Sequence, residues 1–252
     1  MSATKKLLQI LDLFNDQRTY LRVEDVSRLL EVSQATAYRY VGDLTDAALI
    51  EKAPGGRYVL GPAIVMLERQ IRLTDPLLAA AQDIMKTLTE RTGGTSLLCR
   101  LHGREVVCVH QVPGRLSPPT VSFERGRAMP LFRGATSRII LAHVLPGVLA
   151  ELVRDEGPAL RAAGLPTRLD ALTERMAVWR SEEVCIAVGE VDLDAMGIAV
   201  PIHHHRTLLG SLSVVVSSSR AANDARKIAD QVRRAGLRIE GRLDGDGRTF
   251  RR

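Results

Sequence analysis

The sequence predicts a mixed α+β chain in which a small helical domain with a β-hairpin precedes a larger domain built on an antiparallel sheet. Three observations predict this fold class. Apolar residues recur at helical spacing through residues 7–48, two short extended segments then flank a Gly-Gly turn, and later pairs of β-branched runs are separated by helical segments. With 252 residues, 45% of them hydrophobic, the chain can bury such a core without disulfides.

The N-terminal domain is expected to span residues 1–61. Ser33 precedes an apolar periodic run and is the expected N-cap of the third helix, whose inward positions are Ala37, Val41, Leu44 and Ala48. The predicted elements of this domain are helices near 7–14, 23–30 and 34–48 and strands at 49–52 and 57–60.

A linker helix over residues 62–74 is expected to lead into the larger domain, residues 75–244, followed by a basic tail, residues 245–252. Gly61-Pro62 and Asp75-Pro76 mark the two ends of the linker. Its apolar residues Ile64, Leu67 and Ile71 are candidates for dimer contacts. The larger domain is predicted to contain helices at 77–91, 137–144, 148–155, 169–179 and 223–243 and strands at 96–101, 106–112, 185–188, 198–202 and 209–216.

The stretch from Val23 to Ala48 predicts a helix-turn-helix. Such a unit needs a supporting helix, a tight turn and a second helix whose N-terminal side chains enter the DNA major groove. If Ala37 lies at the centre of the buried face, the opposite face of the second helix carries side chains of the kinds that contact bases. Gln can bind adenine, Arg can bind guanine, and Ala or Thr can contact a thymine methyl group. The predicted contact residues on this helix are Gln34, Ala35, Thr36, Tyr38 and Arg39.

Two cations flank the tip of the following hairpin. Lys52 and Arg57 lie on either side of Gly55-Gly56, and a winged helix uses such a tip against the DNA backbone or minor groove. We therefore expect a winged helix-turn-helix that binds double-stranded DNA. The alternative interpretation is a winged helix that binds another protein, or a helical subdomain whose polar face is only solvated.

The net charge of +6 and the pI near 9.6 first suggest a nucleic-acid partner. The distribution of charge weakens that argument, because residues 1–61 hold eight Lys or Arg and eight Asp or Glu. Residues 220–252 hold ten basic and five acidic side chains, so the excess lies outside the predicted reading head. DNA binding therefore depends on where the cations stand, not on their number.

Several motifs, in order, resemble the IclR (isocitrate lyase regulator) family of bacterial transcription factors. Residues 29–40 resemble the reading helix of that family, and residues 56–62, GRYVLGP, resemble its wing. Residues 130–142, PLFRGATSRIILA, resemble the family stretch P-L-H-A-T-A-x-G-K-A-x-L-A, and residues 196–202 and 210–214 resemble its two late strands. The resemblance runs from about residue 4 to residue 230.

This resemblance implies a winged helix-turn-helix followed by a profilin- or GAF-like α/β effector-binding domain. It implies dimers or dimers of dimers on palindromic operators, and a small organic acid, often aromatic, as effector. The implied pocket contains small residues, hydroxyls and helix-start amides that can hold a carboxylate, beside an apolar wall. Its candidate residues are Met129, Leu131, Ala135, Thr136, Ser137, Glu190, Gly197, Ser213 and Val215. The alternative for Thr136 and Ser137 is that they cap the following helix.

The sequence departs from the family pattern at four places. Ala35 stands where the family usually has Ser, Phe132-Arg133 replaces His-Ala, Ser137-Arg138 replaces Gly-Lys, and Gly197 replaces Cys. Most of these changes fall where members bind effectors, so the ligand of a relative cannot be transferred to this chain.

Other chemistry has little support. His203-His204-His205 suggests a metal, but neighbouring side chains on a strand point to opposite faces, so no metal site is expected. The cysteines Cys99, Cys108 and Cys185 are expected to be buried. Without a nucleophile elbow, an H-E-x-x-H motif or a phosphate loop, we expect no enzyme and no cofactor. We also expect no membrane span and a cytoplasmic location.

Overall fold

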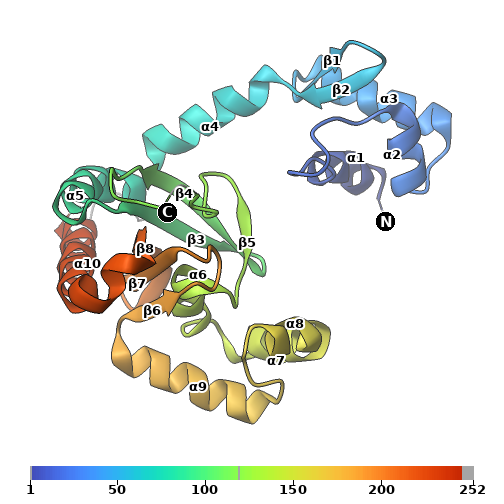
Figure 1. The fold of residues 1–252 in the computed structure, drawn as a ribbon. Coiled ribbons are helices and arrows are strands. Elements are labelled where there is room, and N and C mark those ends of the chain that lie inside the picture. Colours follow the sequence, from blue (N-terminus) through green and yellow to red (C-terminus); the bar gives the residue numbers. More distant parts are fainter. Residues whose placement is uncertain (1, 119, 246–252) are drawn as a thin grey trace. The chain divides into compact units, whose positions relative to one another are not determined.

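The computed structural model describes residues 2–118 and 120–245. The chain divides into two compact units, Met1–Asp75 and Pro76–Arg252 (Figure 1). The predicted basic tail falls almost entirely on residues 246–252, which lie outside the described residues. Among the described helices, none has both the length and the apolar character that a bilayer span requires.

The first unit contains the predicted three helices, hairpin and linker helix. Ser33 is the N-cap of the third helix, as predicted: its Oγ accepts a hydrogen bond of 3.2 Å from the Thr36 amide. That helix ends at Asp46, before the predicted end at Ala48, because Ala48 adopts a left-handed φ of 55° in the following turn. The elements are α1 Ala3–Asp12, α2 Val23–Leu29, α3 Gln34–Asp46, β1 Ile50–Ala53, β2 Arg57–Leu60 and α4 Pro62–Thr74.

The hairpin is fastened to the helices from two sides. Ile50 at the start of β1 is buried with the apolar faces of the three helices. On the outer edge, Leu21 and Tyr58 exchange backbone hydrogen bonds of 2.9 and 2.7 Å. Gly55 and Gly56 at the tip have φ of 76° and 70°, a conformation that favours glycine.

The second unit is built on a six-stranded antiparallel sheet of order β5-β4-β3-β8-β7-β6. The sequence predicted five of these strands and missed β5, which has only three residues; the six-residue α8 was missed for the same reason. The helix predicted at residue 137 begins at Gly134. The elements are α5 Pro76–Thr92, β3 Thr95–His102, β4 Glu105–Val112, β5 Ala128–Pro130, α6 Gly134–Leu141, α7 Pro146–Asp155, α8 Gly157–Ala162, α9 Leu169–Glu182, β6 Cys185–Val188, β7 Ala195–His204, β8 Thr207–Ser217 and α10 Ala221–Gly245.

Helices cover both faces of this sheet, so its central strands are apolar on both sides. Leu98 packs with α5 and α10 on one face, while its neighbour Leu97 packs with α6 and α9 on the other (Figure 1). The same alternation separates Val214 from Val215 on β8. This arrangement explains why the sequence shows continuous apolar runs here instead of a strict polar–apolar alternation.

Gly210 on β8 lies against the neighbouring strand. A Cβ atom at this position would lie 2.0 Å from the carbonyl oxygen of Cys99 on β3. We predict that Gly210→Ala lowers the free energy of unfolding by more than about 2 kcal/mol, because the backbone must shift to relieve the overlap.

Gly241→Ala is the matched control. Gly241 lies in α10, and a Cβ there would meet nothing within 4 Å, so alanine should raise stability by about 0.5–1 kcal/mol. Urea denaturation followed by circular dichroism measures both variants. Equal stability of the two variants would show that the β3–β8 contact is not as tight as described.

Candidate functional site

One face of α3 is buried and the opposite face is exposed. Ala37, Tyr40, Val41 and Leu44 pack into the core of the first unit. The exposed face carries four of the predicted residues in a row along the first two turns: Gln34, Ala35, Tyr38 and Arg39. Tyr38 retains 57% exposure, a large value for an aromatic side chain.

Thr36 has a different position from the other four. It is half-buried, and its Oγ1 lies 2.9 Å from the Ser33 Oγ while its amide donates to the same oxygen. The hydroxyl therefore belongs to the cap of α3.

The two predicted cations of the wing are both exposed, but only Arg57 is stacked on an aromatic ring. Lys52 on β1 is exposed. Arg57 on β2 is also exposed, but its guanidinium lies 4.4 Å above the ring of Tyr20, which fixes its direction. The cation Lys6 makes contacts within the first unit, because its Nζ donates a hydrogen bond of 3.0 Å to the Leu30 carbonyl just after α2.

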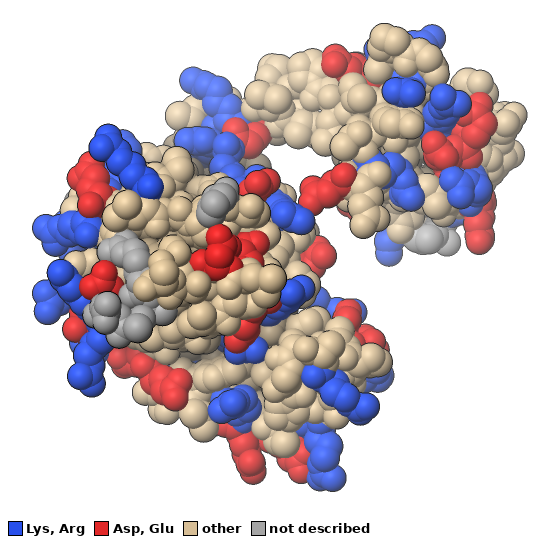
Figure 2. Space-filling model, viewed as in Figure 1, with Lys and Arg blue, Asp and Glu red and all other residues tan. Residues whose placement is uncertain are grey.

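Acidic and basic side chains are interspersed over the visible face of the molecule, and neither sign forms a continuous sheet of charge (Figure 2). On α2, Arg28 pairs with Asp25 at 3.0 Å. The hydrogen bond from the Arg22 amide, followed by the Arg28 guanidinium, lowers the pKa of the Asp25 carboxyl. On α2, the positive charge of Arg28 is therefore partly neutralised by Asp25.

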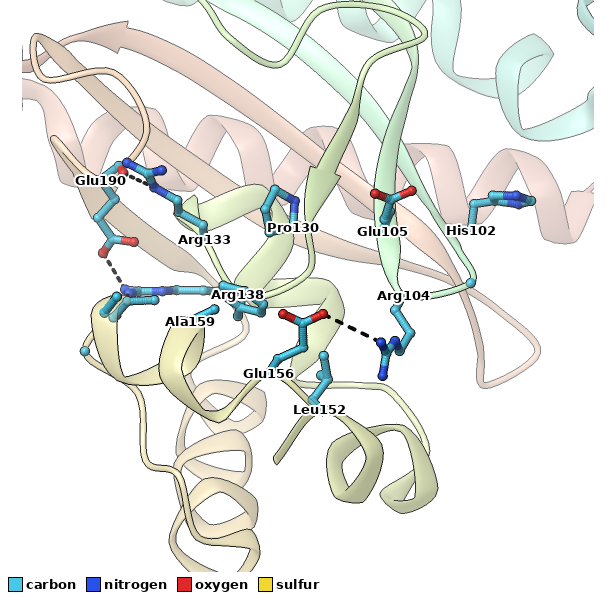
Figure 3. Close-up of a pocket in the computed structure, with 15 residues that line it drawn as sticks. His102, Arg104, Glu105, Pro130, Arg133, Arg138, Leu152, Glu156, Ala159 and Glu190 are labelled. Atoms are coloured by element: carbon cyan, nitrogen blue, oxygen red, sulfur yellow. Dashed lines mark hydrogen bonds and ion pairs between the residues drawn. The ribbon is translucent and has the colours of Figure 1, made fainter. Parts of the chain in front are cut away.

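The second candidate region surrounds the first turn of α6. Gly134 begins this helix with φ of 79°, and its amide donates to Glu190 Oε2 at 3.2 Å. The other oxygen of the same carboxylate is paired with Arg138 Nη1, and Arg133 Nε donates to the Glu190 carbonyl at 2.7 Å (Figure 3). A carboxylate from a distant loop therefore occupies the positive end of α6.

Five of the nine predicted effector residues line one small cavity beside this turn: Ala135, Thr136, Glu190, Gly197 and Val215. The space inside it is about 30 Å³, which is the room of a single water molecule. The cavity lies between α6, β6, β7, β8 and the loops that precede β5 and β7, so the predicted residues do meet in space.

The other four predicted residues are buried but do not line this cavity. Ser213 lies behind it, where its Oγ is 2.9 Å from Thr136 Oγ1. Met129, Leu131 and Ser137 are buried in the surrounding core. Because Thr136 bonds to β8, and α6 begins at Gly134 with no side-chain cap, the alternative that Thr136 and Ser137 cap the helix is wrong.

The sequence did not point to the residues that close the cavity from the loop side. Ser122 and Asp192 join these loops, since the Ser122 amide donates to Asp192 Oδ2 at 2.9 Å. Neither loop shows the hydrophobic periodicity from which helices and strands are predicted. The one sequence feature that could have pointed to this region is the Gly189-Glu190 turn between two predicted strands. The missed lining residues are Val121, Phe123, Gly134, Ala187, Val191, Asp192 and Ala195.

A larger open groove of about 1170 Å³ lies on the other side of Glu190. Arg104 at the tip of β3–β4 lies 3.6 Å from Glu156, which also lines the groove (Figure 3). Its guanidinium also pairs with Asp155 at 2.7 Å. Arg133 and Arg138 line the same groove. Glu190 belongs to the walls of both spaces, so its side chain separates the cavity from the groove.

The three cysteines are buried and reduced, as predicted. Cys99 stands opposite Cys108 in the β3–β4 ladder. Burial raises the pKa of the Cys185 thiol to about 12 and that of Cys99 well above its ordinary value. None of them is a ready nucleophile.

Two family models match this chain. The IclR helix-turn-helix domain matches residues 3–54, and the bacterial transcriptional regulator IclR C-terminal domain matches residues 73–240. The chain belongs to the IclR family. It is thus a transcriptional regulator with a helix-turn-helix DNA-binding domain and a C-terminal effector domain, as the sequence motifs predicted.

Relatives of this IclR chain match it along nearly its whole length. The HTH-type transcriptional regulator XynR of Escherichia coli K12 is 27% identical over 244 residues, 95% of this chain and 96% of the relative. A solved IclR regulator from Silicibacter sp. TM1040 is 26% identical, with a TM-score of 0.81 and 96% of both chains covered. An IclR homologue from Microbacterium hydrocarbonoxydans, solved with 4-hydroxybenzoate, is 21% identical, with a TM-score of 0.76, 97% of this chain and 100% of that chain covered, and so supports the fold.

Proposed function

We propose that this IclR-family regulator binds a palindromic operator through α3 and the β1–β2 wing, and that its second unit changes this binding when it holds a small organic acid. The observation that carries the proposal is the exposed row of Gln34, Ala35, Tyr38 and Arg39 on α3, which lies within the stretch matched by the IclR helix-turn-helix domain. We further propose that the chain acts in the cytoplasm, without a cofactor and without catalysis.

On DNA, Arg39 is proposed to address a guanine and Gln34 an adenine in the major groove. Ala35 and the methyl group of Thr36 offer apolar contact to thymine, and Tyr38 contacts the adjacent backbone. Lys52 and Arg57 hold the flanking phosphates from the wing. The neutral charge of residues 1–61 means that these few placed cations must supply the attraction.

In the second unit, the effector carboxylate is proposed to bind the Gly134 amide at the start of α6, where Glu190 Oε2 now lies 3.2 Å away. The ligand therefore has to displace Glu190 and widen a space that holds about 30 Å³. Ala135 and Gly197 leave room for it, Thr136 and Val215 line it, and Ser213 and Ser137 offer hydroxyls once the site opens. Met129 and Leu131 form the apolar layer behind. The 4-hydroxybenzoate in the Microbacterium homologue supports a small aromatic acid.

The linker helix α4 supports a homodimer. None of its residues is buried within the chain, and its apolar side chains Val65, Met66, Leu67, Ile71 and Leu73 are 54–70% exposed. An unpartnered apolar helix of this size is an interaction surface. We propose that a second copy covers it, and that dimers pair further on the operator.

We predict that Arg39→Ala removes sequence discrimination. An Arg–guanine pair contributes about 1–3 kcal/mol of discrimination, so the variant should lose affinity for the operator and keep its affinity for unrelated DNA. An electrophoretic shift assay against the region upstream of its own gene, with Arg175→Ala on α9 as control, measures this.

Two other results are informative. A uniform loss on all DNA would make Arg39 a phosphate contact. If the unaltered protein shows no sequence-dependent binding even at low salt, the protein-interaction alternative gains and the operator proposal fails.

We predict that at least one small organic acid raises the melting temperature of the full chain and alters its operator affinity. The panel should include 4-hydroxybenzoate and aliphatic mono- and dicarboxylates, with matching amides as neutral controls. Glu190→Gln should bind the active acid more tightly, because the internal competitor has lost its charge. If no acid shifts melting or operator binding, the sensor proposal is refuted; weaker binding by the variant would refute displacement.

We predict that Leu67→Asp converts the dimer to a monomer, because a carboxylate would be buried in the paired α4 surface. Sedimentation equilibrium of the full chain measures this. Leu193→Asp is the matched control, since Leu193 is 90% exposed on a loop of the second unit and should leave the dimer intact. A monomeric unaltered protein, or an unaffected Leu67 variant, rules out the α4 interface.

A further inference from the structure

We propose that His204, His205 and Asp244 form a binding site for a late first-row divalent cation, with Zn²⁺ as the simplest occupant. One ring nitrogen of each histidine and one carboxylate oxygen of Asp244 lie within 4.8 Å of one another. Imidazole and carboxylate are ligands that zinc, copper and nickel accept. The inference is independent of the effector pocket, because none of these three residues lines it.

The turn between β7 and β8 brings the two histidines together. The rule that neighbouring side chains point to opposite faces holds along the strand, so it separates His203 from His204. His205 lies beyond the strand, where φ becomes 47°, and Arg206 follows with φ of 66°. The ring centroids of His204 and His205 are consequently 4.0 Å apart. The strand argument concerned all three histidines together and does not apply to these two, because His205 lies in the turn.

The turn is unusual for its residues. A two-residue hairpin turn with positive φ at both positions normally uses Asn-Gly or Gly-Gly, because larger side chains are strained there. His205 and Arg206 hold this conformation without glycine. Strained backbone of this kind tends to persist at functional positions, and here it has the effect of aiming a second imidazole at the first.

The third ligand comes from the end of α10. Asp244 Oδ1 lies 3.8 Å from His204 Nε2. One helical turn earlier, Glu240 accepts a hydrogen bond from the His203 amide at 2.7 Å and lies 3.4 Å from its ring nitrogen. Glu240 thus fixes the last turns of α10 against β7, which places Asp244 beside His204 and leaves His203 outside the site.

The geometry is within reach of a tetrahedral ion. Ligand atoms 2.0–2.1 Å from zinc stand about 3.4 Å apart. The present separations, 3.8 Å between His204 and Asp244 and at most 4.8 Å for the other pairs, therefore need to shorten by no more than about 1.4 Å. His205 and Asp244 are exposed and can rotate, while the ring of the buried His204 is held in place. Three protein ligands leave the fourth position to water. A bound ion would join the β7–β8 turn to the end of α10.

Isothermal titration of ZnCl₂ into the full chain, prepared without an affinity tag and treated with EDTA, tests the proposal. We expect one zinc per chain, with binding at least about tenfold weaker in His205→Ala and in Asp244→Asn. His203→Ala is the matched control and should bind zinc as the unaltered chain does. Circular dichroism of each variant confirms folding, and the conservative Asp244→Asn keeps the test valid if His205→Ala does not fold.

The opposite results are equally definite. If zinc does not bind, or binds with the same affinity in Asp244→Asn and His205→Ala, there is no site at these residues. If His203→Ala weakens binding as much as His205→Ala, the histidine run binds zinc without the described geometry, and the proposal fails.

Discussion

The second unit depends on one constraint: its sheet is buried on both faces, so α6 must pack directly on β7 and β8. Close approach is possible because the facing residues are small. A Cβ on Gly197 would already lie 3.4 Å from the Ala135 Cβ, and Thr136 reaches Ser213 at 2.9 Å. The start of α6 is therefore held against the sheet with its amides turned toward the loop that carries Glu190. The candidate pocket therefore forms where the first turn of α6 packs against β7 and β8.

In the first unit the main constraint is electrostatic, because residues 1–61 carry no net charge that could attract DNA. Its specificity has to come from a helix that is held firmly while one face stays bare. The Ser33 cap fixes where α3 begins, and four buried residues fix its rotation. Exposure of Gln34, Tyr38 and Arg39 is then a consequence of helix geometry, not of local polarity.

Much of this could be predicted from the sequence, because long apolar patterns carry the information. The Ser33 cap, the Gly-Gly wing and the β3–β4 strand pair followed from local rules. Motif order led to five residues that line the cavity but not to the loop residues that close it, since contacts such as Ser122 with Asp192 join positions 70 apart that no periodicity relates. Position in a motif also could not reveal that Thr36 serves the cap or that Met129 and Leu131 lie in the core behind the cavity.

Glu190 has a consequence for chemical selectivity. In the absence of a ligand, its carboxylate balances both the amide end of α6 and the Arg138 guanidinium. An uncharged molecule that displaced Glu190 would leave the half-buried Arg138 guanidinium and the amide end of α6 without a counter-charge, which is unfavourable. An anion of similar shape replaces what it removes. If an effector displaces Glu190 as proposed, this arrangement would favour acids over esters, amides and alcohols of similar shape.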